Sequence, residues 1–568
     1  MSRSLFRKKS IDRIIKDAEE SIDMGHHTEL KKILNVRDLT FMGIAAVVGA
    51  GIFSTIGSAA FNGGPGISLL FVLTAVTCGF SALCYAEFAS RVPISGSAYT
   101  YAYVSFGEII AWIIGWALIL EYAIGNIVVA ISWSGYFNNL LVALGIHLPP
   151  WLTADPGTAY NAYSQAQLAL AANQPLTPSL QFALDAWNSA PRLGDKTIFI
   201  NLPAFIIVVL VTILTYIGIR ESKKTTNAMV VFKLAVIVFV IILGFFFVDT
   251  NNWSPFMPNG VEGVLKGVSA VFYAYIGFDA ISTTAEECKN PQRDLPKGMI
   301  YSLLICTGLY ILIALVLTGM VSFESLNVPD PLAEVFDKVG QSWISYIVSI
   351  SAVVATTSVM LVFQLGQPRI WMSMSRDGLL PKIFSKVHPK FHTPSFSTIV
   401  TGVLVAVPSL FMQSSLMTDL TSIGTLFAFV LVSGGVLMLP RIADSQRKGF
   451  KLPYVNGKFI VPIMFILMLF FFWERIQHSF SHLREDSLTE VLFLVFVLLA
   501  FIMSLLTFLR NYSLIPVLGV MFCSYLLIEI PAISWIWFFA WMGIGLFIYF
   551  IYGYRNSKLK TGIMEKNV

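Results

Sequence analysis

The apolar residues of this chain fall into uninterrupted runs that are long enough to cross a lipid bilayer, and this feature limits the possible folds most strongly. A transmembrane helix needs about 20 mostly apolar residues, and such runs recur from about residue 40 to about residue 553. The chain is 56% hydrophobic and only 12% charged, whereas soluble domains carry about 25% charged residues. We therefore predict an all-α integral membrane protein with about 14 transmembrane helices.

The positions of Lys and Arg test this layout independently, because positive residues are retained on the cytoplasmic side of a membrane protein. If the N-terminus is cytoplasmic, most of the 38 Lys and Arg residues lie in cytoplasmic segments. The residues that fall outside are Arg192, Lys196, Lys266, Lys338, Arg475 and Arg484. The pattern predicts a multi-pass protein of a plasma or bacterial inner membrane with both termini cytoplasmic. It also accounts for the net charge of +5 as attraction to an anionic leaflet, so we expect no nucleic acid partner.

The order of polar and apolar segments predicts four regions. We expect a cytoplasmic N-terminal arm at 1–39, a ten-helix core at 40–440, four additional transmembrane helices at 441–553 and a cytoplasmic tail at 554–568. The one long hydrophilic insertion, 146–197, is predicted to be an extracytoplasmic loop. A loop of this length is typical of either a functional lid or a surface decoration, and we favour a decoration.

Two of the predicted spans are interrupted near their middles. The segment Gly49–Phe53 contains two glycines and lies within the first span, 40–61, and Tyr275–Asp279 lies within the sixth span, 267–285. If spans one to five and six to ten are inverted repeats, the two interruptions occupy corresponding positions, which points to a substrate site near the membrane midplane. Glycine also serves simply to let helices pack closely. The acidic Asp279, which is costly in a lipid-facing helix, favours unwound helices that line a cavity.

Four sequence blocks, in this order along residues 40 to about 440, resemble one transporter family. They are Tyr85–Tyr101, Gly115–Tyr122, Tyr273–Pro296 and Gly366–Pro381. Together they resemble the cationic amino acid transporter branch of the amino acid-polyamine-organocation superfamily. The resemblance implies a secondary active transporter with a five-plus-five inverted repeat and broken first and sixth helices. It also implies a substrate that binds between a bundle of helices 1, 2, 6 and 7 and a scaffold.

The two interruptions offer complementary groups to an amino acid. Backbone N–H groups of Ala50 and Gly51, freed from helical bonding, can bind a carboxylate. Carbonyl groups of Tyr273, Ala274 and Ile276 can accept hydrogen bonds from the ammonium group. The predicted substrate-binding residues are Gly49, Ala50, Gly51, Ile52, Tyr273, Ala274, Ile276, Phe278, Glu121 and Thr356.

Among these residues, Phe278, Glu121 and Thr356 are the candidates for selecting the substrate side chain. Relatives in the family often carry an acidic residue at the position of Ala117, one helical turn before Glu121 and on the same face. Because this chain lacks that acid, we expect broad transport of neutral to cationic L-amino acids.

Lys233 lies inside the fifth predicted span, where a charged side chain is costly. Its long side chain could reach the cytoplasmic interface. The resemblance instead implies a cation at the place where sodium-coupled relatives bind Na⁺. We therefore assign Lys233 to coupling and expect sodium-independent transport, either linked to protons through a change in its protonation or with a permanently charged lysine. Gating is assigned to Asp279, Glu87, Arg91 and Arg369.

Other classes of function lack their sequence signals. The five cysteines have no metal-ligand spacing, no histidine lies in a predicted span, and no G-x-x-x-x-G-K-[ST] loop occurs. We therefore expect neither an enzyme nor a primary pump, and we expect no cofactor and no metal. The expected partners are an amino acid, protons and the lipid bilayer. An amino acid exchanger (antiporter) and a polyamine carrier remain the alternatives.

Overall fold

The computed structural model describes residues 5–9, 34–49, 51–92, 96–172, 175–217, 222–328, 330–391, 393–439, 449–481 and 487–559, and every structural statement below refers to these residues. The fold is almost entirely helical. The α-helices are α2 Val36–Val47, α3 Ile56–Gly63, α4 Ile67–Arg91, α5 Ser97–Ser105, α6 Glu108–Ala143, α7 Pro156–Ala171, α8 Pro178–Ser189, α9 Leu202–Ile217, α10 Ser222–Phe245, α11 Gly260–Leu265, α12 Val268–Tyr273, α13 Pro291–Met320, α14 Pro331–Lys338, α15 Ser342–Arg376, α16 Ser395–Ser409, α17 Ser414–Met438, α18 Ile460–Phe471, α19 Trp473–Ser481, α20 Ser487–Arg510, α21 Leu514–Ile528, α22 Ala532–Ile548 and α23 Tyr554–Asn556.

Short irregular elements connect or interrupt these helices. The π-helical turns are η1 Gly51–Thr55 and η9 Tyr549–Gly553, and the 3₁₀ segments are η2 Gly64–Gly66, η3 Pro150–Leu152, η4 Thr250–Trp253, η5 Phe278–Glu287, η6 Phe323–Ser325 and η7 Lys382–Ser385. The strands β1 Arg192–Leu193 and β2 Lys196–Thr197 pair antiparallel, with Arg192 opposite Thr197.

Among the described residues, nine helices are long and apolar enough to cross a membrane, or ten if the pair α18 and α19, bent by 64°, counts as one span. Three shorter apolar helices, α9, α16 and α21, accompany them. The last part of the first predicted span is continuous with the second span, because α3, η2 and α4 form one helical run, Ile56–Arg91. The helical membrane class predicted from the sequence is confirmed.

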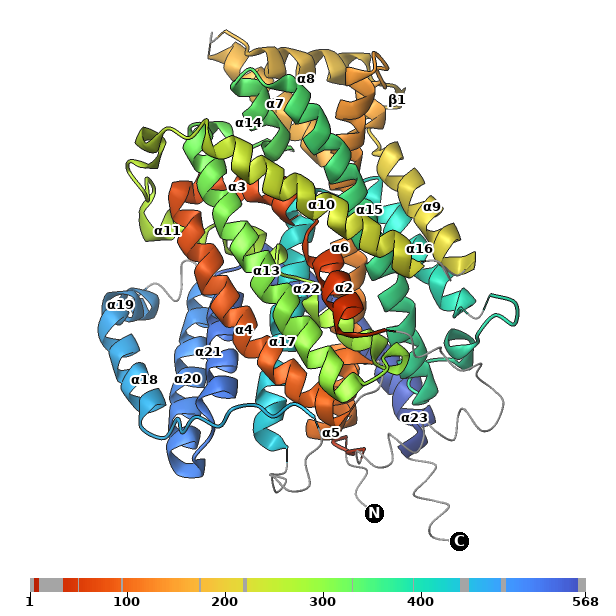
Figure 1. Ribbon diagram of the computed structural model, residues 1–568, viewed down its shortest axis with the longest axis vertical. Helices are drawn as coiled ribbons and strands as arrows, with labels where there is room; N and C mark the ends of the chain where they lie inside the picture. Colours follow the sequence, from red (N-terminus) through yellow and green to blue (C-terminus); the bar gives the residue numbers. More distant parts are fainter. Residues whose placement is uncertain are drawn as a thin grey trace.

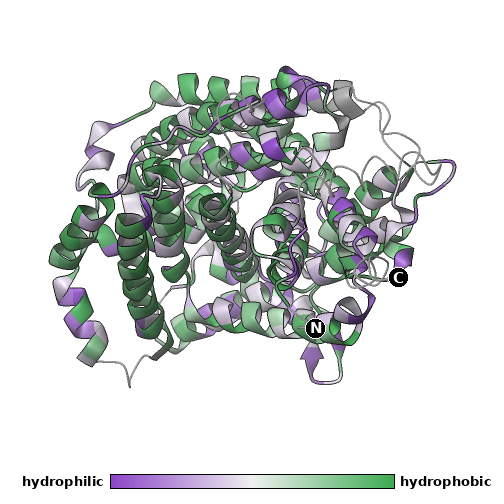
Figure 2. Ribbon diagram, turned by 90° about the horizontal axis from the view of Figure 1, so that it is seen from below, coloured by the Kyte–Doolittle hydropathy of each residue, from purple (hydrophilic) through white to green (hydrophobic). Residues whose placement is uncertain are grey.

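Helix α6 lies at the centre of the molecule and is buried along most of its length. It packs against α15, α17, α9, α16 and α22, while α4 packs against α13 and α2 packs against α13, α10 and α15. Figure 1 places α7 and α8 at one end of the molecule and α5 and α23 at the other. These are called the α8 end and the α5 end below. Figure 2 shows that strongly apolar helices make up much of the periphery, as contact with lipid requires.

Described residues close to both termini lie together at the α5 end. The side chain of Arg7 forms an ion pair of 2.9 Å with the fully buried Glu108 at the start of α6, and Lys9 forms one of 2.9 Å with Asp377 at the end of α15. Glu108 also accepts a hydrogen bond of 2.9 Å from the hydroxyl of Tyr549. The described part of the N-terminal arm is therefore fastened to α6 and α15.

Candidate functional site

The first span breaks where the sequence predicted. Helix α2 ends at Val47, and the π-helical turn η1 begins at Gly51. The N–H groups of Ile52 and Phe53 both donate to the carbonyl of Gly49, each at 3.1 Å. The regular pattern of i to i−4 bonds is therefore lost over one turn, and its backbone groups become available to other partners.

The carbonyl groups released by this break are bound by side chains from other helices. Lys233 of α10 donates to the carbonyls of Ala45, at 3.0 Å, and Val48, at 2.7 Å, and the hydroxyl of Tyr310 donates to Val47, at 2.9 Å. In a continuous helix two of these carbonyls, those of Ala45 and Val47, would accept from the N–H groups of Gly49 and Gly51.

Among the described residues, the N–H groups of Gly49 and Gly51 have no backbone acceptor. The break thus presents unpaired donors on one side while its carbonyls are satisfied on the other. Such donors at a helix interruption are suited to a carboxylate.

The sixth span breaks between α12, which ends at Tyr273, and η5, which begins at Phe278. Gly277 has a φ of +111°, a conformation that glycine adopts easily, and an added Cβ would lie 2.8 Å from the Cβ of Ala46. The carbonyl of Tyr273 accepts from Ile276 at 3.2 Å, whereas those of Ala274 and Ile276 have no backbone donor among the described residues. Two unpaired acceptors therefore face the break.

The two breaks lie in direct contact. An added Cβ on Gly51 would come within 2.3 Å of the Cα of Ala274, and one on Gly49 within 2.4 Å of Cγ2 of Val359. These glycines are required because backbone or a branched side chain occupies the space beside them. A larger residue at Gly51 would therefore collide with the chain of the sixth span as well as disturb the free N–H group.

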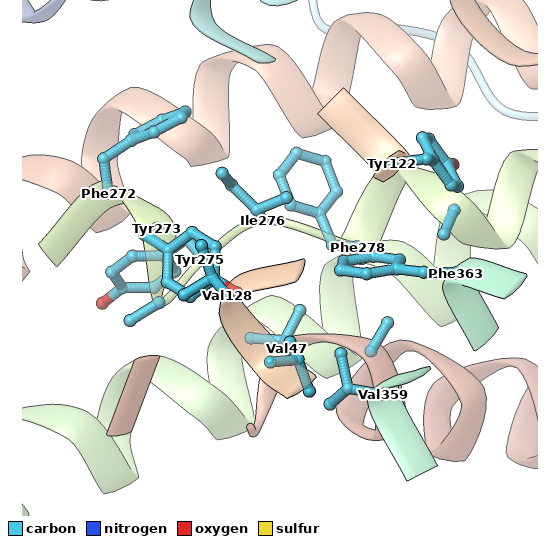
Figure 3. Close-up of a cluster of buried hydrophobic side chains, with 14 of the residues drawn as sticks. Val47, Tyr122, Val128, Phe272, Tyr273, Tyr275, Ile276, Phe278, Val359 and Phe363 are labelled. Atoms are coloured by element: carbon cyan, nitrogen blue, oxygen red, sulfur yellow. The ribbon is translucent and has the colours of Figure 1, made fainter. Parts of the chain in front are cut away.

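A small cavity of about 10 Å³, which is room for about one water molecule, lies between the breaks, so the two spans are closed against each other in this structure. It is lined by Ala46, Val47, Gly49, Gly51, Val129, Tyr273, Ile276, Val359 and Phe363. Figure 3 shows Tyr273 and Ile276 of the sixth span in one cluster with Val47, Val359 and Phe363. The sequence predicted Gly49, Gly51, Tyr273 and Ile276, but it gave no signal for the apolar residues that α6 and α15 contribute.

Two buried carboxyl groups stand on α6 and η5, and some of their oxygens make no hydrogen bond of ordinary geometry within the described residues. Glu121 on α6 is 2% exposed and Asp279 on η5 is 1% exposed. Within the described residues, no hydrogen bond of ordinary geometry reaches Oε2 of Glu121 or either carboxylate oxygen of Asp279, although the backbone N–H groups of Gly277, Asp279 and Ala280 lie close to the Asp279 carboxylate and stabilise its charge. The two groups interact electrostatically with each other. Buried polar atoms are nearly always paired, so these oxygens indicate room for a ligand or water.

Three tyrosine hydroxyl groups share this property. The hydroxyls of Tyr85, Tyr101 and Tyr122 are buried and make no hydrogen bond of ordinary geometry in the described part of the chain, although that of Tyr101 lies close to Ser282. All three interact electrostatically with Asp279. Glu121, Asp279 and these tyrosines are called the acidic chamber below. Sequence reasoning found its two acids but not its tyrosines, although Tyr85, Tyr101 and Tyr122 all stand in the blocks that resemble the transporter family.

Lys233 is completely buried and has three acceptors. Besides the carbonyls of Ala45 and Val48, its Nζ donates to Oγ of Ser358 on α15 at 3.1 Å. An ammonium group has three donors, so every proton of a charged Lys233 is used. The side chain points into the protein and joins α10, the first break and α15. Ser358 was missed from the sequence, although it lies two residues after the predicted Thr356.

The remaining predicted binding residues are placed as follows. Ala50 lies outside the described residues. Ile52 is fully buried. Phe278 packs its ring against Tyr85 and Phe429. The hydroxyl of Thr356 donates to the carbonyl of Ala352 in its own helix at 2.6 Å, and Thr356 is not among the residues that line the cavity.

Of the predicted gating residues, Asp279 belongs to the acidic chamber, and Glu87 and Arg91 lie in the last two turns of α4. Arg91 pairs with Glu87 at 2.6 Å, one turn apart on α4, and Glu87 also accepts at 2.8 Å from the N–H group of Leu452 in the segment before α18. Arg369 on α15 interacts electrostatically with Tyr122. No group of three or more His, Cys, Asp or Glu residues in the described part of the chain could hold a metal ion.

Comparison of the sequence with known proteins identifies a matching family. Residues 34–482 match the model described as amino acid permease, and residues 512–557 match the C-terminus of that family. The chain is 38% identical over 560 residues to the branched-chain amino acid permease BcaP of Bacillus subtilis (strain 168), which covers 98% of this chain and 100% of that protein.

Two further relatives differ in the substrates that their names give. The chain is 34% identical over 557 residues to the methylthioribose transporter of Bacillus subtilis (strain 168), with 98% of this chain and 99% of that protein covered. It is 36% identical over 445 residues to the vacuolar cationic amino acid transporter 4 of Arabidopsis thaliana, with 77% and 67% covered. The resemblance seen in the four sequence blocks is thereby confirmed.

Proposed function

The chain belongs to the amino acid permease family within the amino acid-polyamine-organocation superfamily, and from this membership we propose that it is a secondary active transporter that moves L-amino acids across a cell membrane. The observation that carries the proposal is the contact between two broken spans around one cavity. Among the residues that the structure describes, the N–H groups of Gly49 and Gly51 on one side and the carbonyls of Ala274 and Ile276 on the other have no backbone partner. Main chain alone can thus bind both charged ends of an α-amino acid.

For the architecture, we propose fourteen spans with a five-plus-five inverted repeat in residues 40–440 and four additional helices at 441–553. The distribution of Lys and Arg supports a cytoplasmic α5 end and an extracytoplasmic α8 end. In this orientation, segment 146–197, with α7 and α8, is extracytoplasmic. The first and sixth spans then cross near the midplane, where alternating access requires a substrate site.

For coupling, we propose that transport is proton-coupled and independent of sodium. A charged Lys233 uses all three of its protons to hold the first break and α15 together, so no separate cation is needed there. A neutral amine has only two donors, and loss of the proton would therefore release at least one of these contacts. Proton release is in this way linked to loosening of α2, the half of the first span that ends at the α5 side of the cavity.

For selectivity, we propose that the acidic chamber binds the substrate side chain or the water around it. Glu121 and Asp279 would attract a cationic group, while the apolar lining from Val359 and Phe363 suits a neutral one. The relative named as a branched-chain permease and the one named as a cationic transporter support a range from neutral to cationic. Ala117 in place of an acid argues against strict preference for cations.

For gating, we propose that Asp279, Arg369 and the pair Glu87–Arg91 close the path between the chamber and the α5 end. Glu87 connects α4 to the segment before α18 by accepting from the N–H group of Leu452. A change in the Glu87–Arg91 pair would therefore affect the positions of both elements. These contacts must rearrange when the site opens to the cytoplasm.

Uptake into proteoliposomes that contain the purified full-length chain tests the proposal. We expect labelled leucine to accumulate under an inward proton gradient without Na⁺, and neutral and cationic amino acids to compete. Exchange without accumulation would favour the antiporter alternative, and competition by putrescine without any amino acid would favour the polyamine carrier. Uptake that required Na⁺ and ignored an imposed pH gradient would contradict the proposed coupling.

A further inference from the structure

The short helix α14 covers the outer half of the first span at the α8 end. The segment before it lies so close to α3 that an added Cβ on Gly57 would come within 2.3 Å of the carbonyl oxygen of Leu326 and within 3.0 Å of Pro331. Helix α14 also packs against η1 and α15. Access to the cavity from this end therefore requires α14 and the outer half of the first span to move.

Helix α6 holds both of these elements with two residues one turn apart. The hydroxyl of Tyr136 donates to the carbonyl of Phe53 in η1, and their rings meet edge to face with centroids 6.1 Å apart. The side-chain amide of Asn139 donates to the carboxylate of Asp330, the residue before α14. One face of α6 thus fastens the first break and α14 at the same time.

Asp330 is the N-cap residue of α14 but does not cap the helix with its side chain. It stands at the N-cap of α14, where an aspartate side chain commonly accepts from its own helix, yet its side chain makes no such bond and its oxygen accepts from Asn139 instead. The backbone of Asp330 still begins the helix, because its carbonyl accepts from Ala333 and Glu334. The carboxyl group is therefore committed to a contact between elements.

We propose, on the basis of the transport function proposed above, that Tyr136 and Asn139 form an outer latch with Phe53 and Asp330, and that protonation of Asp330 closes this latch. Asp330 and Asn139 are positioning residues for the transport cycle, because they act on the position of α14 and do not line the cavity. The latch would make opening toward the α8 end sensitive to the pH on that side, separately from Lys233.

The groups around Asp330 determine the direction of this effect. On its own helix, the acids Glu334 and Asp337 face it, and on α6 it faces Asn139 and Tyr136. Lys338 is paired with Glu334, at 3.5 Å, and among the described residues no cation pairs with Asp330. Burial, and then the charge of Glu334, raise the pKa of Asp330 from the ordinary value of 3.8 to about 6, although the bond from Asn139 acts to lower it.

The direction of the pH effect follows from the difference in the pKa of Asp330 between the closed and open states. When α14 moves away, the carboxyl group becomes hydrated and its pKa returns toward the ordinary value, so closing takes up a proton between about pH 4 and pH 6. Acid stabilises the closed latch, and this stabilisation is lost as the pH rises through about 6. Between pH 7 and pH 5 we expect the ratio of closed to open molecules to rise about tenfold.

A fluorophore on α14 tests the latch without any substrate. All five native cysteines are buried, so Lys338→Cys in the full-length purified protein provides a single accessible thiol. We expect the emission of an environment-sensitive dye to titrate between pH 4 and 7. Asp330→Asn should remain at the acidic value throughout, because its amide oxygen still accepts from Asn139 but carries no charge.

Two variants calibrate this result. Glu334→Gln should keep the titration but move its midpoint to lower pH, since it removes the like charge that raises the pKa of Asp330. Asn139→Ala should shift the equilibrium about fivefold toward the open state, as expected for one hydrogen bond of about 1 kcal/mol, and by more above the pKa of Asp330 than below it, because this bond favours the charged carboxylate. Glu262→Gln, an exposed acid on α11 paired with Lys266, is the control and should leave the titration unchanged.

Transport then provides a second measurement. With equal pH on both sides of the membrane, exchange of labelled amino acid should depend on pH in the unmodified protein, and this dependence should be reduced in Asp330→Asn. An unchanged dye titration in Asp330→Asn would overturn the latch. A dye titration that follows the expectation in a protein that transports no amino acid would leave the latch standing and refute the proposed function.

Discussion

Two buried charged regions of the molecule, Lys233 on one hand and Glu121 with Asp279 on the other, are built in opposite ways. Lys233 has an acceptor for each of its three protons. Glu121 and Asp279 are buried to a similar extent, but three of their oxygens make no hydrogen bond of ordinary geometry among the described residues, and only backbone N–H groups lie close to Asp279. A buried charged group that makes all of its hydrogen bonds stabilises the fold, whereas one with free hydrogen-bonding capacity is suited to bind a ligand or water. We therefore expect substitutions at Lys233 to affect every substrate and those in the acidic chamber to affect only some.

The largest effect is expected for Lys233→Ala. This change leaves the buried carbonyls of Ala45 and Val48 without their donor, at about 1–3 kcal/mol each. We expect gradient-driven accumulation to be abolished for all amino acids, exchange to persist at a reduced rate, and thermal stability to fall. Uptake and exchange in proteoliposomes, together with a melting curve, measure the three quantities.

Ser358→Ala is the matched control for this lysine. It removes one acceptor of Lys233 but leaves both carbonyls of the first break bound, so accumulation should be reduced and not lost. If Lys233→Ala accumulated substrate as well as the unmodified protein, the lysine would be no more than a packing residue.

A smaller and selective effect is expected for Glu121→Gln and Asp279→Asn. Each change preserves shape and removes one charge, so the fold should be as stable as before or more so because the repulsion between the two acids is relieved. We expect competition by arginine and lysine to weaken about tenfold or more, as for loss of a hydrogen bond to a charged group, while uptake of leucine changes little. A uniform loss for all substrates would show that the acids belong to the framework after all.

The smallest effect is expected for Ala117→Asp. Ala117 is fully buried one turn from Glu121, and an added carboxylate there should shift preference toward cationic amino acids by about threefold to tenfold. Ala117→Asn has nearly the same shape without the charge and serves as the control. In the unmodified protein, neutral amino acids should compete at least as well as arginine, and an exclusive response to arginine would restore a strictly cationic assignment.

The sequence predicted the parts of the site that depend on local signals. Long apolar runs predicted a helical membrane protein, and the glycines at 49, 51 and 277 predicted where the first and sixth spans break. Lys233 was found because a lysine in an apolar run is unusual. The number of spans and the inverted repeat were expected from the sequence, and both stay predictions.

The contacts between distant segments could not be predicted in this way. Nothing near Lys233 in the sequence indicates that its partners are Ala45, Val48 and Ser358, which lie more than a hundred residues away. The apolar lining from Val129, Val359 and Phe363 looks like any other membrane helix. The bond of Asn139 to Asp330 joins two polar residues in unremarkable positions, and only packing of α14 against the first span brings them together.

The central claim is that main chain at two broken spans binds both ends of an α-amino acid, and competition by blocked substrates tests it most directly. Labelled leucine uptake in proteoliposomes would be measured against unlabelled leucine, its methyl ester and its N-acetyl derivative. We expect only free leucine to compete, because the ester lacks the carboxylate for Gly49 and Gly51 and the N-acetyl compound lacks the ammonium for Ala274 and Ile276. Inhibition by either derivative equal to that by leucine would contradict the account.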